Sequence, residues 1–156
     1  MQRLFDEDQA ARQSPATSKN EAADIYRQDA ERRITGRKLI ADNALHTAQD
    51  FENAAFIFQH GDTADDYLLA HTLATIAVAK GHTSALWIVT ATLDRYLSKI
   101  GQPQVYGTQY HRDPYTSWTQ DPYNRTLIPD TLLQQLGVPD RAAQEKQLGG
   151  YNAPIK

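Results

Sequence analysis

Cysteine is absent from the 156 residues of the chain, methionine occurs once and tryptophan twice. Without cysteine the protein has no disulfide bond, no thiolate metal ligand and no cysteine nucleophile. Neither sign of charge dominates, because 16 lysines and arginines stand against 19 aspartates and glutamates, for a formal net charge of -3. A slightly acidic chain of this kind does not predict binding to nucleic acid or to an anionic membrane surface.

Long hydrophobic runs are also missing. The most apolar stretch, Leu68 to Val78, is interrupted by one histidine and two threonines, and it is shorter than the roughly 20 residues of a membrane-spanning helix. The opening sequence MQRLFDEDQAARQ is charged from its third residue and lacks the apolar region of a secretory signal. We therefore expect a soluble, cytoplasmic protein, with a hydrophobic content of 40% that supplies the core of a single domain over residues 1–156.

Local motifs of the common enzyme classes do not occur either. The sequence contains no G-x-x-x-x-G-K-[ST], G-x-G-x-x-G, G-x-S-x-G or H-E-x-x-H. Phosphate loops, dinucleotide-binding folds, hydrolase elbows and zinc proteases therefore have no local support. The Glu-x-x-His pairs of di-iron bundles are missing as well. We predict no metal site and no cofactor.

Four segments combine helical periodicity with a start signal. The first, 18–41, opens with Ser18-Lys19-Asn20-Glu21, a capping box in which the glutamate reaches back toward the cap. The third is apolar nearly all round, which is typical of a central helix. The short connections between the second, third and fourth segments predict antiparallel neighbours. These three segments run from Thr47 to Gly61, from Thr63 to Gly81, and from Thr83 or Ser84 to Gly101.

The sequence therefore predicts an all-α fold, an antiparallel bundle of helix hairpins with a repeat-like composition but no second full repeat. Residues 18–101 form its helical core, and residues 1–17 form either a leader segment or a short helix. The segment 102–128 is rich in Pro, Gly, Tyr and Asp, which predicts a loose hairpin or a long ordered loop across the helices. We expect the last six residues to be frayed. Two short helices occupy residues 129–150, from Asp130 to Leu136 and from Asp140 to Leu148.

His71 lies in the middle of the most apolar helix, where an imidazole needs at least one hydrogen-bond partner. One interpretation is a core histidine with an ordinary structural partner. The other pairs it with Asp94, which falls on the apolar face of the fourth helix and needs a cation or several donors there. Arg95 lies about 100° further round the same helix, on the side of the loop that follows.

His60 lies along one edge of the second helix with Asp50 and Asn53. Asp50 already has a structural role as the third residue after the Thr47 cap. His60 occurs in the last turn, where a protonated imidazole complements the helix dipole. A structural role and a functional role for His60 therefore both stay open.

The loop after the fourth helix is rich in hydrogen-bonding side chains. If the segment is extended, Gln104, Tyr106 and Thr108 share one face and Gln109 lies on the other. Such a loop either presents amides to a ligand or satisfies buried helix ends and the Asp94 carboxylate. The sequence leaves both roles open.

Three short motifs resemble a bacterial family of helical domains of unknown function, marked by Q-H-[AG], D-R and Y-G-T-Q elements. In this sequence they are Gln59-His60-Gly61, Asp94-Arg95 and Tyr106-Gly107-Thr108-Gln109. The resemblance covers about residues 20 to 150 and implies no activity. It implies only that these residues belong together.

Two hypotheses for function follow. In the first, eight side chains line a polar pocket for a small molecule or a peptide. In its enzymatic version, His60 or His71 acts as a general base oriented by Asp94, and arginine or glutamine stabilises developing negative charge. In the second, the domain is a non-catalytic helical module for a protein partner, and the same side chains are structural. The eight are the catalytic candidates His60, His71 and Asp94 and the binding candidates Arg95, Gln104, Tyr106, Thr108 and Gln109.

Overall fold

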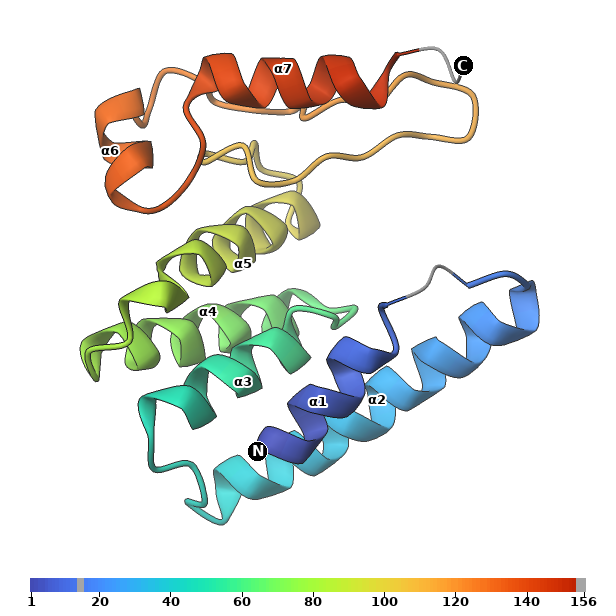
Figure 1. The fold of residues 1–156 in the computed structure, drawn as a ribbon, viewed down its shortest axis with the longest axis vertical. Helices are drawn as coiled ribbons and strands as arrows, with labels where there is room; N and C mark the ends of the chain where they lie inside the picture. The colour runs from blue at the N-terminus through green and yellow to red at the C-terminus, as the bar shows by residue number, and fades with distance from the viewer. Residues whose placement is uncertain (14–15, 154–156) are drawn as a thin grey trace.

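The computed structural model describes residues 1–13 and 16–153, and within them the fold is all-α (Figure 1). Strand-like pairing in this part of the chain is limited to isolated bridges between Gln104 and Tyr123 and between His111 and Thr119. The predicted fold class is therefore confirmed. The helices are α1 (Gln2–Ala10), α2 (Lys19–Ala41), α3 (Ala48–Phe58), α4 (Ala64–Ala79), the 3₁₀ turn η1 (Thr83–Ala85), α5 (Leu86–Lys99), α6 (Asp130–Gln135) and α7 (Arg141–Tyr151).

Three helices begin at the cap residues that the sequence indicates. The side-chain oxygens of Ser18, Thr47 and Thr63 each accept the backbone N–H of the residue three positions later. One detail differs from the prediction, because the Glu21 carboxylate accepts the N–H and the hydroxyl of Thr17 rather than the N–H of the cap. A side-chain cap contributes about 1 kcal/mol to helix stability, and local sequence thus determines where these helices start.

Helix α7 does not end where the sequence predicts. It continues through Gly149-Gly150 to Tyr151, so the predicted stop before the glycines is wrong. The Tyr151 ring packs against the rings of Tyr110 and Trp118, with centroids 5.3 Å apart in each case. This packing offsets the cost of about 1 kcal/mol for each glycine in a helix. Of the end predicted to be frayed, residues 154–156 lie outside the described residues.

Helices α3, α4 and α5 form the centre of the domain, and the chain reverses direction at the short connections between them (Figure 1). Helix α4 packs against both α3 and α5, as its apolar sequence predicts. Phe58, Leu73 and Ile88 fill the core. The side chains between the helices are otherwise small, which lets the backbones approach closely: Ala54, Ala55, Ala70, Ala74 and Ala77.

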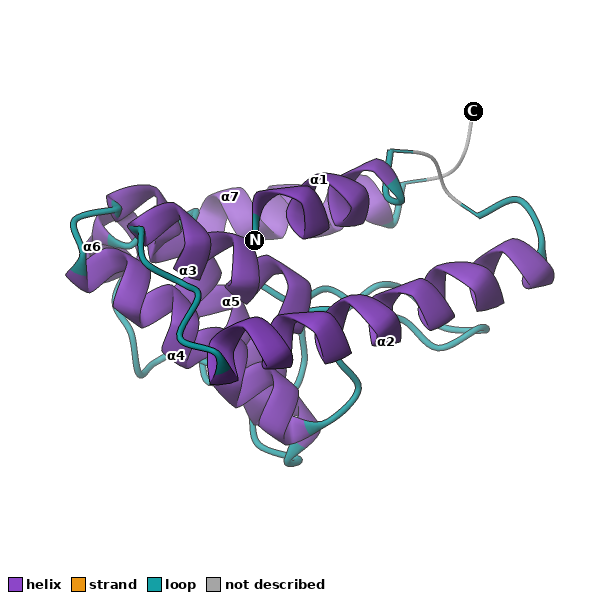
Figure 2. Cartoon of the chain, turned by 90° about the horizontal axis from the view of Figure 1, so that it is seen from below, coloured by secondary structure: helices purple, strands orange, loops and turns teal. Residues whose placement is uncertain are grey.

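Residues 1–17 contain the short helix α1, which lies along α2, and the N-terminal half of α2 projects beyond the other helices (Figure 2). Charged groups are buried where α1 and α2 meet the end of α3. We call this group the charge cluster. Within it, Arg12 Nη1 forms an ion pair with Asp8 Oδ1 at 2.9 Å, and Asp29 accepts hydrogen bonds from Arg12, at 2.9 Å, and from Arg32. His60 completes the cluster, with its Nε2 3.8 Å from an Asp8 oxygen.

The segment 101–129 crosses the end of α5 and returns beneath α7 (Figure 1). His111 and Thr119 exchange two backbone hydrogen bonds, of 2.9 and 2.8 Å, at the base of a loose hairpin. Gln144 of α7 donates to the Tyr106 carbonyl at 3.0 Å and so ties α7 to this segment. The predicted ordered hairpin or loop across the helices is confirmed, and it forms one wall of the site described next.

Candidate functional site

The Asp94 carboxylate fixes the conformation of the loop after α5. Its Oδ1 accepts the backbone N–H groups of Val105 and Tyr106 at 2.8 and 3.1 Å. Its Oδ2 accepts the N–H and the hydroxyl of Thr108 at 3.0 and 2.8 Å. The side chain has no exposed surface. Four donors compensate the buried charge, so Asp94 is occupied by the loop and is not directed at a ligand.

Of the two interpretations of His71, the pairing with Asp94 is wrong. His71 Nδ1 lies 3.0 Å from the carbonyl oxygen of Val89 on the neighbouring helix α5. A backbone carbonyl is sufficient for a partly buried imidazole, since the ring nitrogen that faces it donates. His71 therefore has the structural role that the sequence left open, and Asp94 takes its donors from the loop.

Gln104 also has a structural role. Its side chain is buried and donates to the carbonyl oxygens of Gln109, at 2.9 Å, and of Gln120. Its Oε1 accepts the backbone N–H of Gln109 at 3.0 Å. The amide thus holds two passes of the loop together. With Thr108 and the Tyr106 backbone engaged by Asp94, three of the five predicted binding residues serve the loop itself.

Two further buried amides, Gln120 and Gln144, were not among the predicted residues. Gln120 donates to the Gly107 carbonyl at 2.6 Å and to the Gln144 oxygen at 3.1 Å. Gly107 has a φ of 74°, which interrupts the extended conformation that the predicted alternation requires. A Cβ at this position would lie 2.1 Å from the Gln144 oxygen. Only the three-dimensional fold brings these glutamines together, and their sequence positions give no signal of it.

Arg95 follows Asp94 and, unlike it, has no hydrogen-bond or ion-pair partner among the described residues. Its Nε is buried and makes no hydrogen bond to any described residue. None of the ion pairs within the described part of the chain includes Arg95. Burial lowers the pKa of Arg95, Tyr67 acts in the opposite direction, and the positive charge of Arg12 lowers it further. The guanidinium is therefore a partly buried cation whose Nε is out of contact with solvent, and no described residue forms an ion pair with it.

Arg95 lines a pocket of about 330 Å³ between α5, the start of α4 and the loop. Arg95 and Gln109 are the two predicted binding residues in its lining. None of the seven lining residues is acidic, so the pocket is positively charged. The Gln109 side-chain amide donates to the Thr108 hydroxyl at 3.0 Å, which fixes its orientation. The lining consists of Tyr67, Arg95, Ser98, Lys99, Gln109, Tyr110 and His111.

The pocket draws its side chains from three segments. Arg95, Ser98 and Lys99 are spaced i, i+3 and i+4 and therefore share one face of α5. Tyr67 comes from the first turns of α4. His111 comes from the loop, where its backbone is fixed by the bridge to Thr119. Ser98 and Lys99 were not among the predicted site residues, and their spacing from Arg95 on α5 was the signal in the sequence that could have identified them.

His60 does not line this pocket and belongs to the charge cluster. Burial, followed by the positive charges of Arg12 and Arg95, lowers the pKa of His60 from 6.5 to about 3. The predicted neighbour Asp50 completes the capping box of α3 instead. His60, His71 and Asp94 therefore have separate partners, and their predicted convergence on one pocket is wrong.

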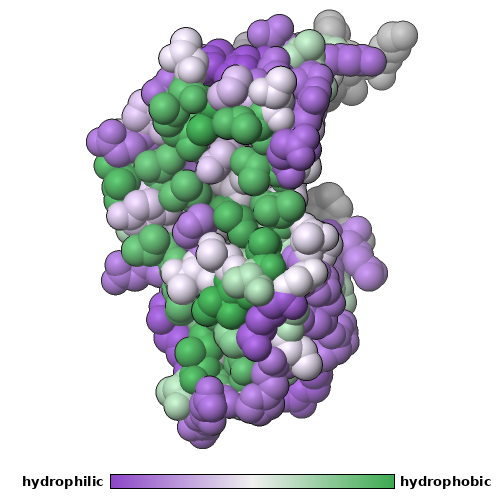
Figure 3. Space-filling model, turned by 90° about the vertical axis from the view of Figure 1, so that its left-hand side faces the viewer, coloured by the Kyte–Doolittle hydropathy of each residue, from purple (hydrophilic) through white to green (hydrophobic). Residues whose placement is uncertain are grey.

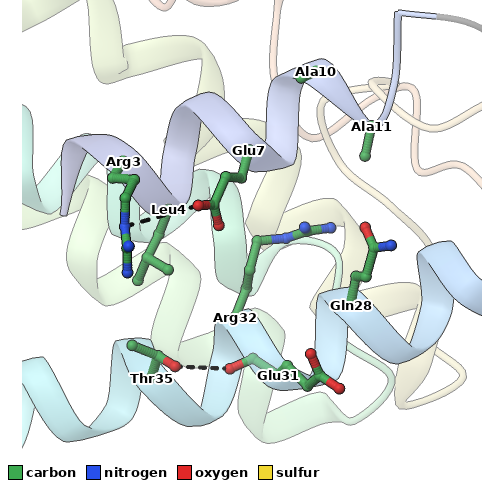
Figure 4. A pocket seen from close by; sticks show the side chains of 9 residues that line it. All are labelled: Arg3, Leu4, Glu7, Ala10, Ala11, Gln28, Glu31, Arg32 and Thr35. Atoms are coloured by element: carbon green, nitrogen blue, oxygen red, sulfur yellow. Dashed lines mark hydrogen bonds and ion pairs between the residues drawn. The ribbon is translucent and has the colours of Figure 1, made fainter.

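A larger cavity, of about 540 Å³, lies between α1 and α2 (Figure 4). None of the predicted site residues lines it. Its arginines are already paired, Arg3 with Glu7 at 3.8 Å and Arg32 with Asp29. It therefore lacks the unpaired cation that distinguishes the Arg95 pocket.

Within the described residues no group of three or more His, Asp or Glu side chains has the arrangement of a metal site. No helix in that part of the chain has the length and apolar character needed to cross a membrane. Comparison with known protein families, with curated proteins and with solved structures finds no match.

Proposed function

We propose that this protein is a binding domain whose pocket at Arg95 takes a small molecule, or the end of a peptide, through an anionic group. The observation that supports the proposal is the buried Nε of Arg95, which has no hydrogen-bond partner among the described residues. Desolvating a cation is costly unless an anion or several acceptors compensate it. An anionic ligand in the pocket supplies the missing compensation.

Simple binding is favoured over acid–base catalysis. A histidine that acts as a general base is normally oriented by a carboxylate or a similar group. His111 is the histidine of the pocket, and no carboxylate lines the pocket with it. Asp94, the predicted orienting group, already accepts four hydrogen bonds from the loop.

The test is a titration of the ¹⁵N-labelled protein with benzoate, phenyl phosphate and uncharged benzamide, followed by NMR. We expect at least one of the two anions to shift amide resonances of residues 95–99 and 109–111. We expect benzamide not to do so, and the anion-induced shifts to vanish in Arg95→Met. If neither anion perturbs these amides in the wild-type protein, the proposed function is wrong.

A second candidate function, a module for a protein partner, is favoured by the apolar surface. Figure 3 shows apolar residues gathered over much of one side of the molecule, and Trp87 is 42% exposed. Large exposed apolar areas are typical of interaction surfaces. Sedimentation velocity over a range of protein concentrations tests this candidate, since self-association that Trp87→Ser removes would favour it.

We extend the proposal to the cellular setting. The absence of cysteine, and with it of disulfide bonds, favours the cytoplasm. The net charge of -3 gives no support to a nucleic-acid partner. Fractionation of the source cells, with detection of the protein by antibody, is the direct measurement.

A further inference from the structure

The Arg95 pocket carries more positive charge than a carboxylate needs. Arg95 and Lys99 lie one helical turn apart on α5, and His111 faces them from the loop. No carboxylate lines the pocket, and neither Arg95 nor Lys99 forms an ion pair within the described part of the chain. A single carboxylate would be fully bound by the fork of one guanidinium, which leaves the second cation without a role.

We infer that the ligand is a small-molecule phosphate monoester, with its phosphate on Arg95 and Lys99 and its organic part against Tyr67 and Tyr110. This inference rests on the proposed function and specifies its ligand class. A phosphate monoester carries a charge of about -1.5 to -2 near pH 7 and presents three terminal oxygens. Two cations and the Ser98 hydroxyl match that charge and that number of oxygens.

The rest of the lining suits an organic group attached to the phosphate. Tyr67 and Tyr110 are both half-buried phenols, and burial raises the pKa of each, so both are neutral near pH 7. The Tyr110 ring is held edge-on by Tyr151 at a centroid distance of 5.3 Å. A rigid aromatic wall favours a planar or apolar group. The pocket volume of about 330 Å³ is at the small end of ligand sites, which favours a small molecule over a peptide.

Isothermal titration calorimetry at pH 7.5 and low salt tests the inference with four probes: phenyl phosphate, inorganic phosphate, benzoate and a phosphotyrosine peptide. We expect phenyl phosphate to bind at least about fivefold more tightly than benzoate, because it engages both cations. We expect it also to bind more tightly than inorganic phosphate, which has no group for the tyrosine rings.

Each alternative result identifies what fails. Benzoate binding as tightly as phenyl phosphate would overturn the phosphate class but keep the proposed function. Inorganic phosphate binding equally well would overturn the ester. A phosphotyrosine peptide more than about tenfold tighter than phenyl phosphate would overturn the small-molecule assignment. Binding of none of the four would overturn the proposed function together with the inference.

Lys99→Gln separates the two ligand classes within one pocket. Lys99 is exposed, so the substitution is expected to leave the fold intact. We expect it to weaken phenyl phosphate about threefold and benzoate less than twofold, since Arg95 alone pairs with a carboxylate. The matched control is Lys146→Gln on α7, which is also exposed and lies outside the pocket. Equal weakening of both probes by Lys99→Gln, or a similar effect of Lys146→Gln, would contradict the inference.

Discussion

Asp94 and Arg95 are neighbours on α5, but they differ in how their charges are compensated. The Asp94 carboxylate receives four hydrogen bonds from the loop. The Arg95 guanidinium, which lines a pocket with Gln109 and His111 of the same loop, has a buried Nε without any partner among the described residues. The loop thus compensates the charge of Asp94 with hydrogen-bond donors, but it supplies no acceptor to the buried Nε of Arg95.

The difference separates stability from binding. Removing one partner of a buried, internally paired charge is strongly destabilising, whereas a buried charge without a partner lowers stability and is a candidate for a binding role. By this criterion Asp94, Gln104 and Thr108 are structural, and Arg95 is a binding residue. Four sets of substitutions test these structural and binding roles and the packing and charges around them. They follow from the largest expected effect to the smallest.

Asp94→Ala should cause the largest loss of stability. The substitution leaves three backbone N–H groups and the Thr108 hydroxyl without an acceptor in a buried site. We expect the free energy of unfolding to fall by about 4 kcal/mol, the scale of a broken buried charge network. Urea denaturation followed by circular dichroism measures it.

Asp94→Asn is the matched control for the charge. Its amide keeps one acceptor oxygen but turns an N–H group toward donors of the loop, so we expect a loss of about 2 kcal/mol or more. A loss below about 1 kcal/mol for the alanine variant would contradict the structural role of Asp94.

Gly107→Ala should have the second-largest effect. A Cβ there would meet the Gln144 oxygen at 2.1 Å and the Tyr123 ring at 2.7 Å, in a residue with a φ of 74°. Gly81, with a φ of 93°, has open space around it. We expect Gly81→Ala to cost about 1 kcal/mol, from backbone strain alone, and Gly107→Ala about 3 kcal/mol. Equal melting temperatures for the two variants would contradict the close packing of the amides beneath the loop.

The sequence predicted the helical part of the fold because its signals are local. Thr47 and Thr63 each meet an acid three residues later, and both complete capping boxes form. The end of α7 is different, because it depends on the contact of Tyr151 with Tyr110 and Trp118. A local sequence pattern does not reveal contacts between residues more than 30 positions apart. The glycines Gly149-Gly150 therefore predicted the wrong end for α7.

The candidate site was predictable only in part, for the same reason. The apolar setting of Asp94 correctly indicated a need for several donors. The donors are mainly backbone N–H groups, which every residue except proline carries, and so the sequence left open whether the loop or His71 is the partner of Asp94. Arg95 was among the predicted binding residues, but Tyr67 and His111 reach the pocket from segments whose contact is determined by the whole fold.

The charge cluster offers a third, pH-dependent comparison, between Asp8 and His60. Burial raises the pKa of Asp8 from 3.8 to about 6, and burial lowers that of His60 from 6.5 to about 3. Between about pH 6 and pH 4 the folded state binds the Asp8 proton more strongly, so Asp8 adds stability as the pH falls. Between about pH 6.5 and pH 3 the unfolded state binds the His60 proton more strongly, so His60 removes stability as the pH falls.

Single substitutions separate these opposing effects. From pH 6.5 to pH 4.5 we expect Asp8→Asn to lose about 2 kcal/mol more than the wild type, since only the His60 effect remains. We expect His60→Gln to lose about 2 kcal/mol less than the wild type over the same range. Urea denaturation at each pH is the measurement, with exposed Asp113→Asn as the control. Profiles parallel to the wild type would show that neither group is perturbed by burial.

Arg95→Met in the protein without ligand has the smallest expected effect on stability, and the direction of that effect is the informative result. Methionine keeps the apolar stem and removes a charge whose buried Nε has no partner among the described residues, so we expect stability to be unchanged or higher by up to about 1 kcal/mol. Arg33→Met is the matched control, because Arg33 is buried but donates to Asp62 at 2.9 Å and to the His60 carbonyl at 2.7 Å. Its loss should reach about 2 kcal/mol. If Arg95→Met lowers the melting temperature as much as Arg33→Met does, Arg95 stabilises the fold in the way Asp94 does, and the two neighbours on α5 no longer differ in role.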